Sequence, residues 1–269
     1  MLRTVTATRY VTPLRAGGSL PGLIEGDDCG LYVVKFRAAG QGAKALVAEI
    51  IAGGLARAAG LPAPEVVLIQ LPEGFGNSEP DPEIHDLLSA SAGVNVGLDF
   101  LPGALDLTDP DTGITAELAA RIVVFDAYTT NVDRTCRNPN MLLWQGNPWL
   151  IDHGAALYQH HGSADLRERS GDPFPMIREH VLLSRAGNLH DAEDWLKRAL
   201  TPEVIEDTVD LIPDLLLGED PEGQRDIYAG YLEQRLRNSD PWVRTAVAAQ
   251  VEAVAARRSS APPRGPRDV

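Results

Sequence analysis

The sequence predicts an α+β fold in two parts: a small β-sheet part with one main helix, then a larger, mostly helical part. Strand-type patterns are concentrated before about residue 105, one long helix pattern interrupts them, and helical patterns fill most of the remaining chain. A chain of 269 residues has room for about two domains. We place the division between residues 104 and 105, end the helical part at residue 258, and expect a disordered tail over residues 259–269.

The strands of the first part are predicted from β-branched and aromatic residues that lie between turn formers. They cover TVTATRYV, LYVVKF, PEVVLIQL and the start of NVGLDFLPGALDL. Residues 44–60 are rich in Ala and Leu and predict the long helix, which Gly60 and Pro62 end. Residues 15–30 are rich in glycine and turn formers and predict a loop, and EIHDLLSAS predicts a short helix.

The second part is predicted to open with a helix over residues 114–131, for which Thr115 is a suitable cap. Two short strands, NMLLW and PWLID, follow, and the turn formers QGN join them in a hairpin. Helices are expected at five further segments: FPMIREHVLLSRA, HDAEDWLKRAL, PEVIEDTVDLIPDLLL, GQRDIYAGYLEQRLRN and PWVRTAVAAQVEAVAARR.

Composition excludes several classes of function. The formal net charge is −14 and the arginines are scattered, which argues against a nucleic-acid partner. No run of about eighteen apolar residues occurs and the N-terminus lacks an apolar signal core, so no membrane partner is expected. Cys29 and Cys136 have neither metal nor disulfide spacing, which predicts a reducing cytoplasm.

Lys35 and Glu49 are isolated charges in apolar surroundings. In the strand LYVVKF a buried ammonium is costly unless a carboxylate pairs with it; the alternative is an edge-strand lysine that reaches solvent. Glu49 is the only acid between Lys44 and Gly60, so it either pairs with Lys35 or lies on a narrow solvated stripe. A strand lysine held by a helix glutamate is what a nucleotide-phosphate site requires.

A glycine-rich segment, GGSLPG at residues 17–22, precedes the lysine strand. Glycines let backbone N–H groups approach phosphate oxygens closely, and a serine hydroxyl adds a donor. The segment matches neither the Walker A pattern nor the dinucleotide-binding fingerprint. Its position before the lysine strand nevertheless predicts a phosphate-binding role for Gly17, Gly18, Ser19 and Gly22.

A polar stretch, NVDRTCRNPNMLLWQGNPWLIDHG at residues 131–154, follows an apolar helix pattern. Mg²⁺ binds hard oxygen ligands and keeps several waters, so a few carboxylate and amide oxygens hold it. Phosphoryl transfer also needs a carboxylate to accept or orient the proton of the nucleophile. Asp133 could serve in that role while Asn138 and Asp152 hold the metal; the alternative is a polar loop and a hairpin whose aspartate caps a turn.

The order of glycine loop, strand lysine, helix glutamate, DRTCRN and strand-end DHG resembles the protein-kinase-like phosphotransferases. DRTCRN is similar to the catalytic loop of the phosphoinositide kinases. VDRTCRNPNMLLW followed by WLIDHG resembles most the HipA-like kinases of bacteria. The resemblance covers about residues 10–158 and implies a two-lobed protein-kinase-like fold.

The resemblance also implies roles for single residues. Lys35 would contact the α- and β-phosphates of ATP, with Glu49 paired to it. The segment DFLPG stands where the family's inter-lobe hinge binds adenine, which implies contacts from the backbone of Phe100 and Leu101.

In the polar stretch, the resemblance makes Asp133 the catalytic aspartate and Asn138 and Asp152 the Mg²⁺ ligands, with Asn140 as the alternative to Asn138. The implied reaction is ATP- and Mg²⁺-dependent transfer of the γ-phosphoryl group to a hydroxyl, that of Ser or Thr in a protein. A small-molecule or lipid kinase and a nucleotide-binding pseudokinase scaffold are the alternatives.

Some residues of the motif region depart from the family pattern or have no assigned role. His153 stands where protein kinases usually have Phe, which puts regulation of their kind in doubt. Arg134 and Arg137 could face a transferred phosphate or form surface salt bridges. His160 and His161 lack a third metal ligand, which favours a solvated loop.

Overall fold

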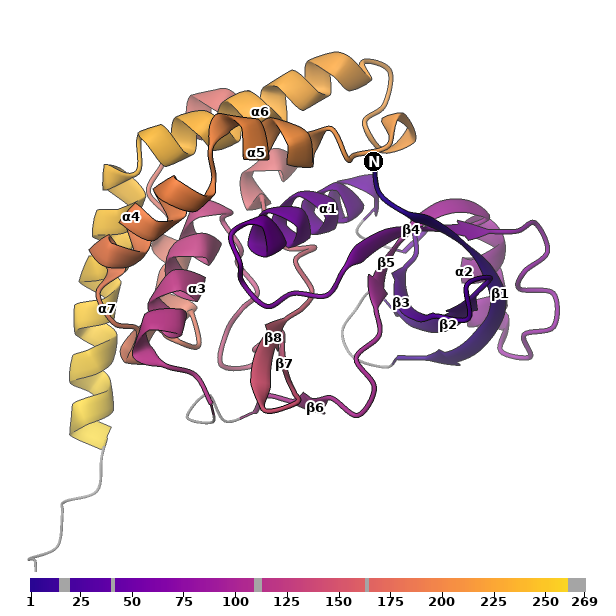
Figure 1. Ribbon diagram of the computed structural model, residues 1–269, viewed down its shortest axis with the longest axis horizontal. Helices are drawn as coiled ribbons and strands as arrows, with labels where there is room; N and C mark the ends of the chain where they lie inside the picture. The colour runs from indigo at the N-terminus through magenta and orange to yellow at the C-terminus, as the bar shows by residue number, and fades with distance from the viewer. Residues whose placement is uncertain (15–19, 40–41, 109–112, 163–164, 261–269) are drawn as a thin grey trace, which may run out of the picture.

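The computed structural model describes residues 1–14, 20–39, 42–108, 113–162 and 165–260, and it has the predicted α+β organisation in two lobes (Figure 1). The first lobe is a closed barrel with the strand order β1-β2-β3-β5-β4. Its strands are β1 (Thr4–Pro13), β2 (Gly22–Gly26), β3 (Leu31–Lys35), β4 (Val66–Leu71) and β5 (Gly93–Asp99). β1 pairs with β4 in parallel and every other pair is antiparallel, so the barrel closes between the first strand and the fourth.

Strand β2 lies in a segment for which the sequence predicts a loop. Its Gly22 pairs with Pro13 of β1 and Val34 of β3. A Cβ at Gly22 would lie 2.7 Å from the Tyr10 ring and 3.0 Å from the Phe36 ring. Glycine at this position therefore makes room for two aromatic rings, which is a packing reason for a residue that the sequence assigns to phosphate binding.

The long predicted helix is α1 (Gly42–Ala58), and most of its residues are buried. It lies between the barrel and the helices α5 and α6, and it packs against β4, β5 and α5 (Figure 1). Gly60 follows it at φ +79°, a left-handed conformation that glycine adopts without strain, so the chain turns there as predicted. Asp81 caps the N-terminus of the short helix α2 (Pro82–Ala90), because its side chain accepts a hydrogen bond from the Glu83 N–H.

The second lobe is built around α3 (Ala116–Tyr128), which is buried along most of its length. Thr115 caps it, because the threonine hydroxyl accepts a hydrogen bond from the Leu118 N–H. The other α-helices are α4 (Leu189–Ala199), α5 (Pro202–Val209), α6 (Pro221–Arg237) and α7 (Asp240–Ser260). Single 3₁₀ turns lie at Tyr158–His161, Leu166–Arg169, Pro175–Glu179, Leu183–Arg185 and Asp214–Leu216. No helix in these described ranges is long and apolar enough to cross a membrane.

The helix predicted over FPMIREHVLLSRA is wrong. The segment forms only two 3₁₀ turns, with extended backbone at His180 between them. There Thr135 and His180 form an antiparallel bridge, and the Val181 N–H donates to the Arg134 carbonyl oxygen. These long-range bonds use backbone groups that a helix would need internally, so tertiary contacts override the local helix pattern.

The predicted hairpin consists of β7 (Met141–Trp144) and β8 (Asn147–Leu150), and β6 (Leu105–Asp106) pairs with β7 to complete a second sheet. Gln145 and Gly146 both have positive φ, at 51° and 78°, as a two-residue mirror-image turn requires. The Trp144 indole N–H donates to the Pro102 carbonyl oxygen at 3.0 Å. The hairpin is thereby fastened to the segment that connects the lobes. The division at residues 104 and 105 stays a prediction.

Candidate active site

Lys35 joins three segments of the chain at one point. Its ammonium lies 2.5 Å from Glu49 Oε2 on α1 and also hydrogen-bonds Asp152 Oδ1, just after β8. The Lys35 side chain is 10% exposed and that of Glu49 is fully buried, so the predicted ion pair is present and the two alternatives to it are excluded. Gly154 lies beside the ammonium: a Cβ there would be 3.3 Å from Nζ, so the glycine leaves room for the lysine.

The charges of this cluster stabilise one another. Burial acts to raise the pKa of Glu49, but the Lys35 charge and a contact from His153 outweigh it and lower the pKa to about 2. Burial acts to lower the pKa of Lys35, but Glu49 and Asp152 together raise it above its usual value. Both Lys35 and Glu49 are therefore charged at neutral pH.

His153 contributes to this cluster in a way that the sequence did not reveal. It is buried, with Nδ1 3.5 Å from Glu49 Oε1, and its ring meets Phe125 edge-on at 6.5 Å. Its Nε2 has no hydrogen-bond partner among the described residues. The histidine thus fills an apolar position and gives Glu49 a second polar neighbour.

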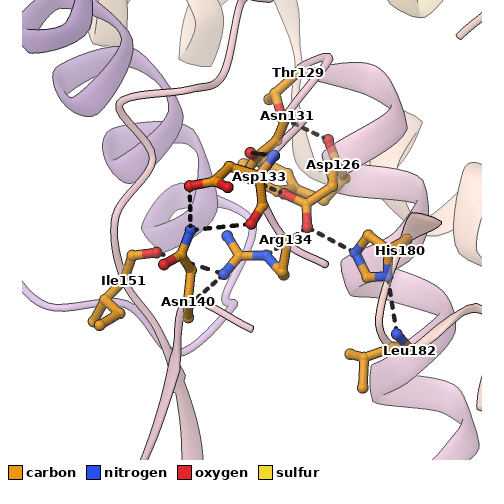
Figure 2. Close-up of polar contacts among 10 residues, drawn as sticks. Asp126, Thr129, Asn131, Asp133, Arg134, Asn140, Ile151, His180 and Leu182 are labelled. Atoms are coloured by element: carbon orange, nitrogen blue, oxygen red, sulfur yellow. Dashed lines mark hydrogen bonds and ion pairs between the residues drawn. The ribbon is translucent and has the colours of Figure 1, made fainter. Parts of the chain in front are cut away.

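Asp133 is held by the residues of its own loop (Figure 2). Its Oδ2 accepts hydrogen bonds from the side-chain amides of Asn138 at 2.7 Å and Asn140 at 3.2 Å. Its backbone N–H donates to Asn131 Oδ1 at 3.1 Å. The structure shows no partner for Oδ1 among the described residues, so one carboxylate oxygen is fixed and the other is available.

The metal-ligand candidates differ in exposure. Asn138 is exposed, Asn140 is 8% exposed, and the Asp152 side chain is 39% exposed. Because Asn138 directs its amide nitrogen at Asp133, its amide oxygen is free to face a cation. Asp152 has φ +54°, a left-handed conformation that is uncommon for residues other than glycine. No group of three or more His, Cys, Asp or Glu side chains in the described ranges is placed to hold a metal ion.

The family model described as HipA-like kinase matches residues 8–231 of the chain. The chain belongs to the HipA-like kinase family. Membership makes it a phosphotransferase with a hydroxyl acceptor, as the motif resemblance implies. No curated protein matches the chain.

Two solved kinases share the fold of this HipA-like chain. The proinflammatory kinase CtkA of Helicobacter pylori gives a TM-score of 0.58 at 13% identity, over 94% of this chain and 99% of that one. The Golgi casein kinase with Mn and ADP bound gives 0.52 at 11% identity, over 93% of this chain and 75% of that one. At these identities the likeness confirms the two-lobed protein-kinase-like fold and no more.

Arg134 does not form the surface salt bridge that the sequence suggested as one of its roles. It is 1% exposed, and its Nε donates to Asp126 Oδ2 of α3 at 2.6 Å, so it forms a buried ion pair and no surface salt bridge. Asp126 is fully buried and was not predicted as a site residue. The signal was available: Asp126 is the only charge in the apolar run IVVFDAY. Arg137 is exposed.

The remaining predicted site residues belong to the glycine-rich segment and to the segment of Phe100 and Leu101. Gly17, Gly18 and Ser19 lie outside the described residues. At the hinge, the Phe100 N–H donates to the Leu31 carbonyl oxygen at 2.9 Å, which ties this segment to β3. The Leu101 N–H has no partner among the described residues and remains the backbone donor at this point.

His160 and His161 do not form a wholly solvated loop, as the sequence favours. His160 is 6% exposed, with Nδ1 3.1 Å from the Tyr228 hydroxyl and Nε2 3.1 Å from Nε2 of the exposed His161. Lys44 of α1 also donates to the His160 carbonyl oxygen. The pair therefore packs where the first lobe meets the second, and the expectation fails for His160.

Proposed function

We propose that this kinase transfers the γ-phosphoryl group of ATP, in the presence of Mg²⁺, to the hydroxyl of Ser or Thr in a protein. The observation that carries the proposal is the bonding of Lys35 to both Glu49 and Asp152. This bonding brings a phosphate-binding cation to a carboxylate that can hold a metal, which are two central requirements of phosphoryl transfer.

ATP would bind between the lobes with its phosphates against Lys35. The lysine supplies a compact positive charge, and Glu49 keeps it in place because the pair is buried and ionised. The free Leu101 N–H supports the proposed adenine contact at Phe100 and Leu101. Gly17, Gly18, Ser19 and Gly22 stay a sequence prediction for the phosphate contacts.

The donor set fits Mg²⁺, which prefers oxygen ligands and retains water. Asp152 would supply a carboxylate oxygen and Asn138 its amide oxygen. Asn140 is the weaker candidate, because its side chain is buried whereas that of Asn138 is exposed. A bound metal ion neutralises charge on the phosphate oxygens.

Asp133 would act on the acceptor hydroxyl. As the hydroxyl oxygen forms a bond to the γ-phosphorus, the bond from that phosphorus to the β–γ bridging oxygen breaks and ADP leaves. The hydroxyl proton would pass to Asp133 Oδ1, the carboxylate oxygen for which the described residues offer no partner. The two asparagine amides keep the other oxygen oriented during this transfer.

The proposal is tested by incubating the protein with γ-labelled ATP and Mg²⁺, alone and with a cell lysate, beside Asp133→Ala and Asp152→Ala. We expect label in protein, at Ser or Thr, with the wild type and background levels with both variants. Label in lipid or in a small molecule would refute the choice of acceptor. No transfer by a wild type that still binds ATP would refute the activity and favour a scaffold.

A further inference from the structure

We propose that Arg134 is a positioning residue that sets the placement of Asp133 relative to Asp152, and that Asp126 and His180 hold Arg134 for this task. The inference rests on the proposed function, in which those two carboxylates act on opposite partners of the reaction. Arg134 directly follows Asp133 in the chain and contacts the residue just before Asp152, so it spans the two halves of the site (Figure 2).

Asp126 anchors the guanidinium. Its Oδ2 accepts from Arg134 Nε at 2.6 Å and from His180 Nε2 at 2.9 Å, and its Oδ1 accepts from Asn131 Nδ2 at 3.2 Å. Burial acts to raise the pKa of Asp126, but Arg134 and His180 outweigh it and hold the pKa well below its usual range. Asp126 is fully buried and accepts three hydrogen bonds, so its carboxylate holds the Arg134 side chain at a fixed place beside α3.

His180 connects the same anchor to the segment after the second-lobe 3₁₀ turn at Pro175–Glu179. Its Nδ1 accepts a hydrogen bond from the Leu182 N–H at 3.1 Å. The ring hydrogen therefore lies on Nε2, which donates the hydrogen bond to Asp126. Val181 N–H donates to the Arg134 carbonyl oxygen at 3.1 Å. The backbone of Arg134 is therefore fixed from one side while its side chain is fixed from another.

Arg134 Nη1 contacts the base of the hairpin formed by β7 and β8. It donates to the carbonyl oxygen of Asn140 and lies 3.5 Å from that of Ile151. The Ile151 N–H donates to the same Asn140 oxygen at 3.0 Å, so these two residues close the hairpin at the point where Asp152 leaves it. One planar side chain thus links α3, the Asp133 loop and the Asp152 segment.

Only the geometry of arginine satisfies all of these partners. Nε points at the carboxylate while Nη1 points at the carbonyl oxygens, a fixed fork that the single ammonium of lysine does not reproduce. Asp126 is 0% exposed and Arg134 is 1% exposed. A buried ion pair often stabilises a fold no more than well-packed apolar residues of similar size would. Its expected benefit is therefore the placement of the groups around it.

Arg134→Lys is the first test, and Arg225→Lys is its matched control. Arg225 on α6 also joins a carbonyl oxygen, of Ile212, to a carboxylate, of Asp214, away from the site. We expect Arg134→Lys to lower kcat for phosphoryl transfer from Mg-ATP at least ten-fold, while KM for ATP stays within three-fold of the wild-type value. Transfer is measured as autophosphorylation and as hydrolysis of ATP by water. The control should match the wild type.

Metal binding gives a readout that needs no acceptor. With ADP present, Mn²⁺ titration followed by electron paramagnetic resonance should show a half-saturating concentration about ten-fold higher in Arg134→Lys. The affinity for ADP without metal should not change. A wild type that binds Mn²⁺ and ADP but transfers nothing would refute the proposed function while leaving this test of Arg134 intact.

The double variant Arg134→Met with Asp126→Leu separates positioning from stability. It removes both buried charges together, so we expect the melting temperature to fall less than in Arg134→Met alone, although His180 and Asn131 lose Asp126 as their acceptor. Transfer and Mn²⁺ binding should stay as impaired as in Arg134→Lys. Recovery of both in the double variant, or wild-type values of both in Arg134→Lys, would overturn the inference.

Discussion

The Lys35 ammonium lies 2.5 Å from the Glu49 carboxylate and is shared with Asp152. Lys35 comes from the barrel, Glu49 from α1 and Asp152 from the segment just after strand β8. A single cation with two carboxylates leaves the cluster with excess negative charge. Removing the lysine would therefore leave two anions together, one of them without access to water.

Lys35→Met should lower both stability and activity. The buried Glu49 loses its cation, which should reduce the free energy of unfolding by about 3–5 kcal/mol. Adding Glu49→Leu should restore most of this loss in urea unfolding without restoring transfer. Lys197→Met is the control, because Lys197 is exposed and the loss of its i,i+4 pair with the partly buried Glu193 should cost below about 1 kcal/mol. A loss for Lys35→Met no larger than this would contradict the buried pair.

Asp133→Asn should impair chemistry with little effect on nucleotide binding. The amide keeps the size of the side chain but takes up a proton poorly, so kcat should fall by about 10²–10⁴-fold. The rise in melting temperature with Mg-ADP should equal that of the wild type. A kcat within a factor of three of the wild type would rule out proton transfer to Asp133.

Asn138 and Asn140 should differ in their effect on the metal requirement. Asn138→Ala should raise the Mg²⁺ concentration for half-maximal transfer several-fold, because an exposed oxygen ligand is lost. Asn140→Ala should instead lower the melting temperature, because its buried amide bonds Asp133. If Asn140→Ala raised the Mg²⁺ requirement and Asn138→Ala did not, Asn140 would be the ligand.

Asp152→Ala should remove most of the melting-temperature rise that Mg-ATP produces in the wild type.

Stability should decrease in mild acid because of His160. Burial, with help from His161 and Lys44, lowers the pKa of His160 to about 3. The unfolded chain takes up this proton near pH 6.5 and the folded protein does not, so unfolding becomes easier as the pH falls from 6.5 towards 3. At pH 5, protonation of His160 in the unfolded chain lowers the free energy of unfolding by about 2 kcal/mol.

His160→Gln should reduce the difference in unfolding free energy between pH 7 and pH 5 by about this amount. The substitution keeps a polar group opposite the Tyr228 hydroxyl. His190→Gln, at an exposed position of α4, is the control and should leave the difference unchanged. Equal pH dependence in wild type and His160→Gln would exclude His160 as the source.

Local signals in the sequence predicted much of the fold. The helix α1, the capping residue Thr115 and the hairpin each depend on neighbouring residues, and each is present. Strand β2 and the two 3₁₀ turns around His180 were missed, because strand pairing and the contacts to Arg134 decide them. Such pairing joins residues that are far apart in the chain and leaves no local period to detect.

The candidate site shows the same division. An isolated charge in an apolar helix predicted the Lys35–Glu49 pair, and the same reasoning applied to Asp126 would have found its buried partner. Nothing in the sequence around His180 marks it as a neighbour of Asp126, which lies 54 residues earlier. Residues that orient others are recognised only when the fold brings them together.

The bond between Lys35 and Asp152 has a consequence for how the two lobes can separate. Asp152 follows a hairpin that Trp144 fastens to Pro102, whereas Lys35 belongs to the barrel, so the bond crosses from one lobe to the other. Any opening that separates the barrel from the hairpin must break it. The ion pair that organises the charges therefore also resists separation of the two lobes.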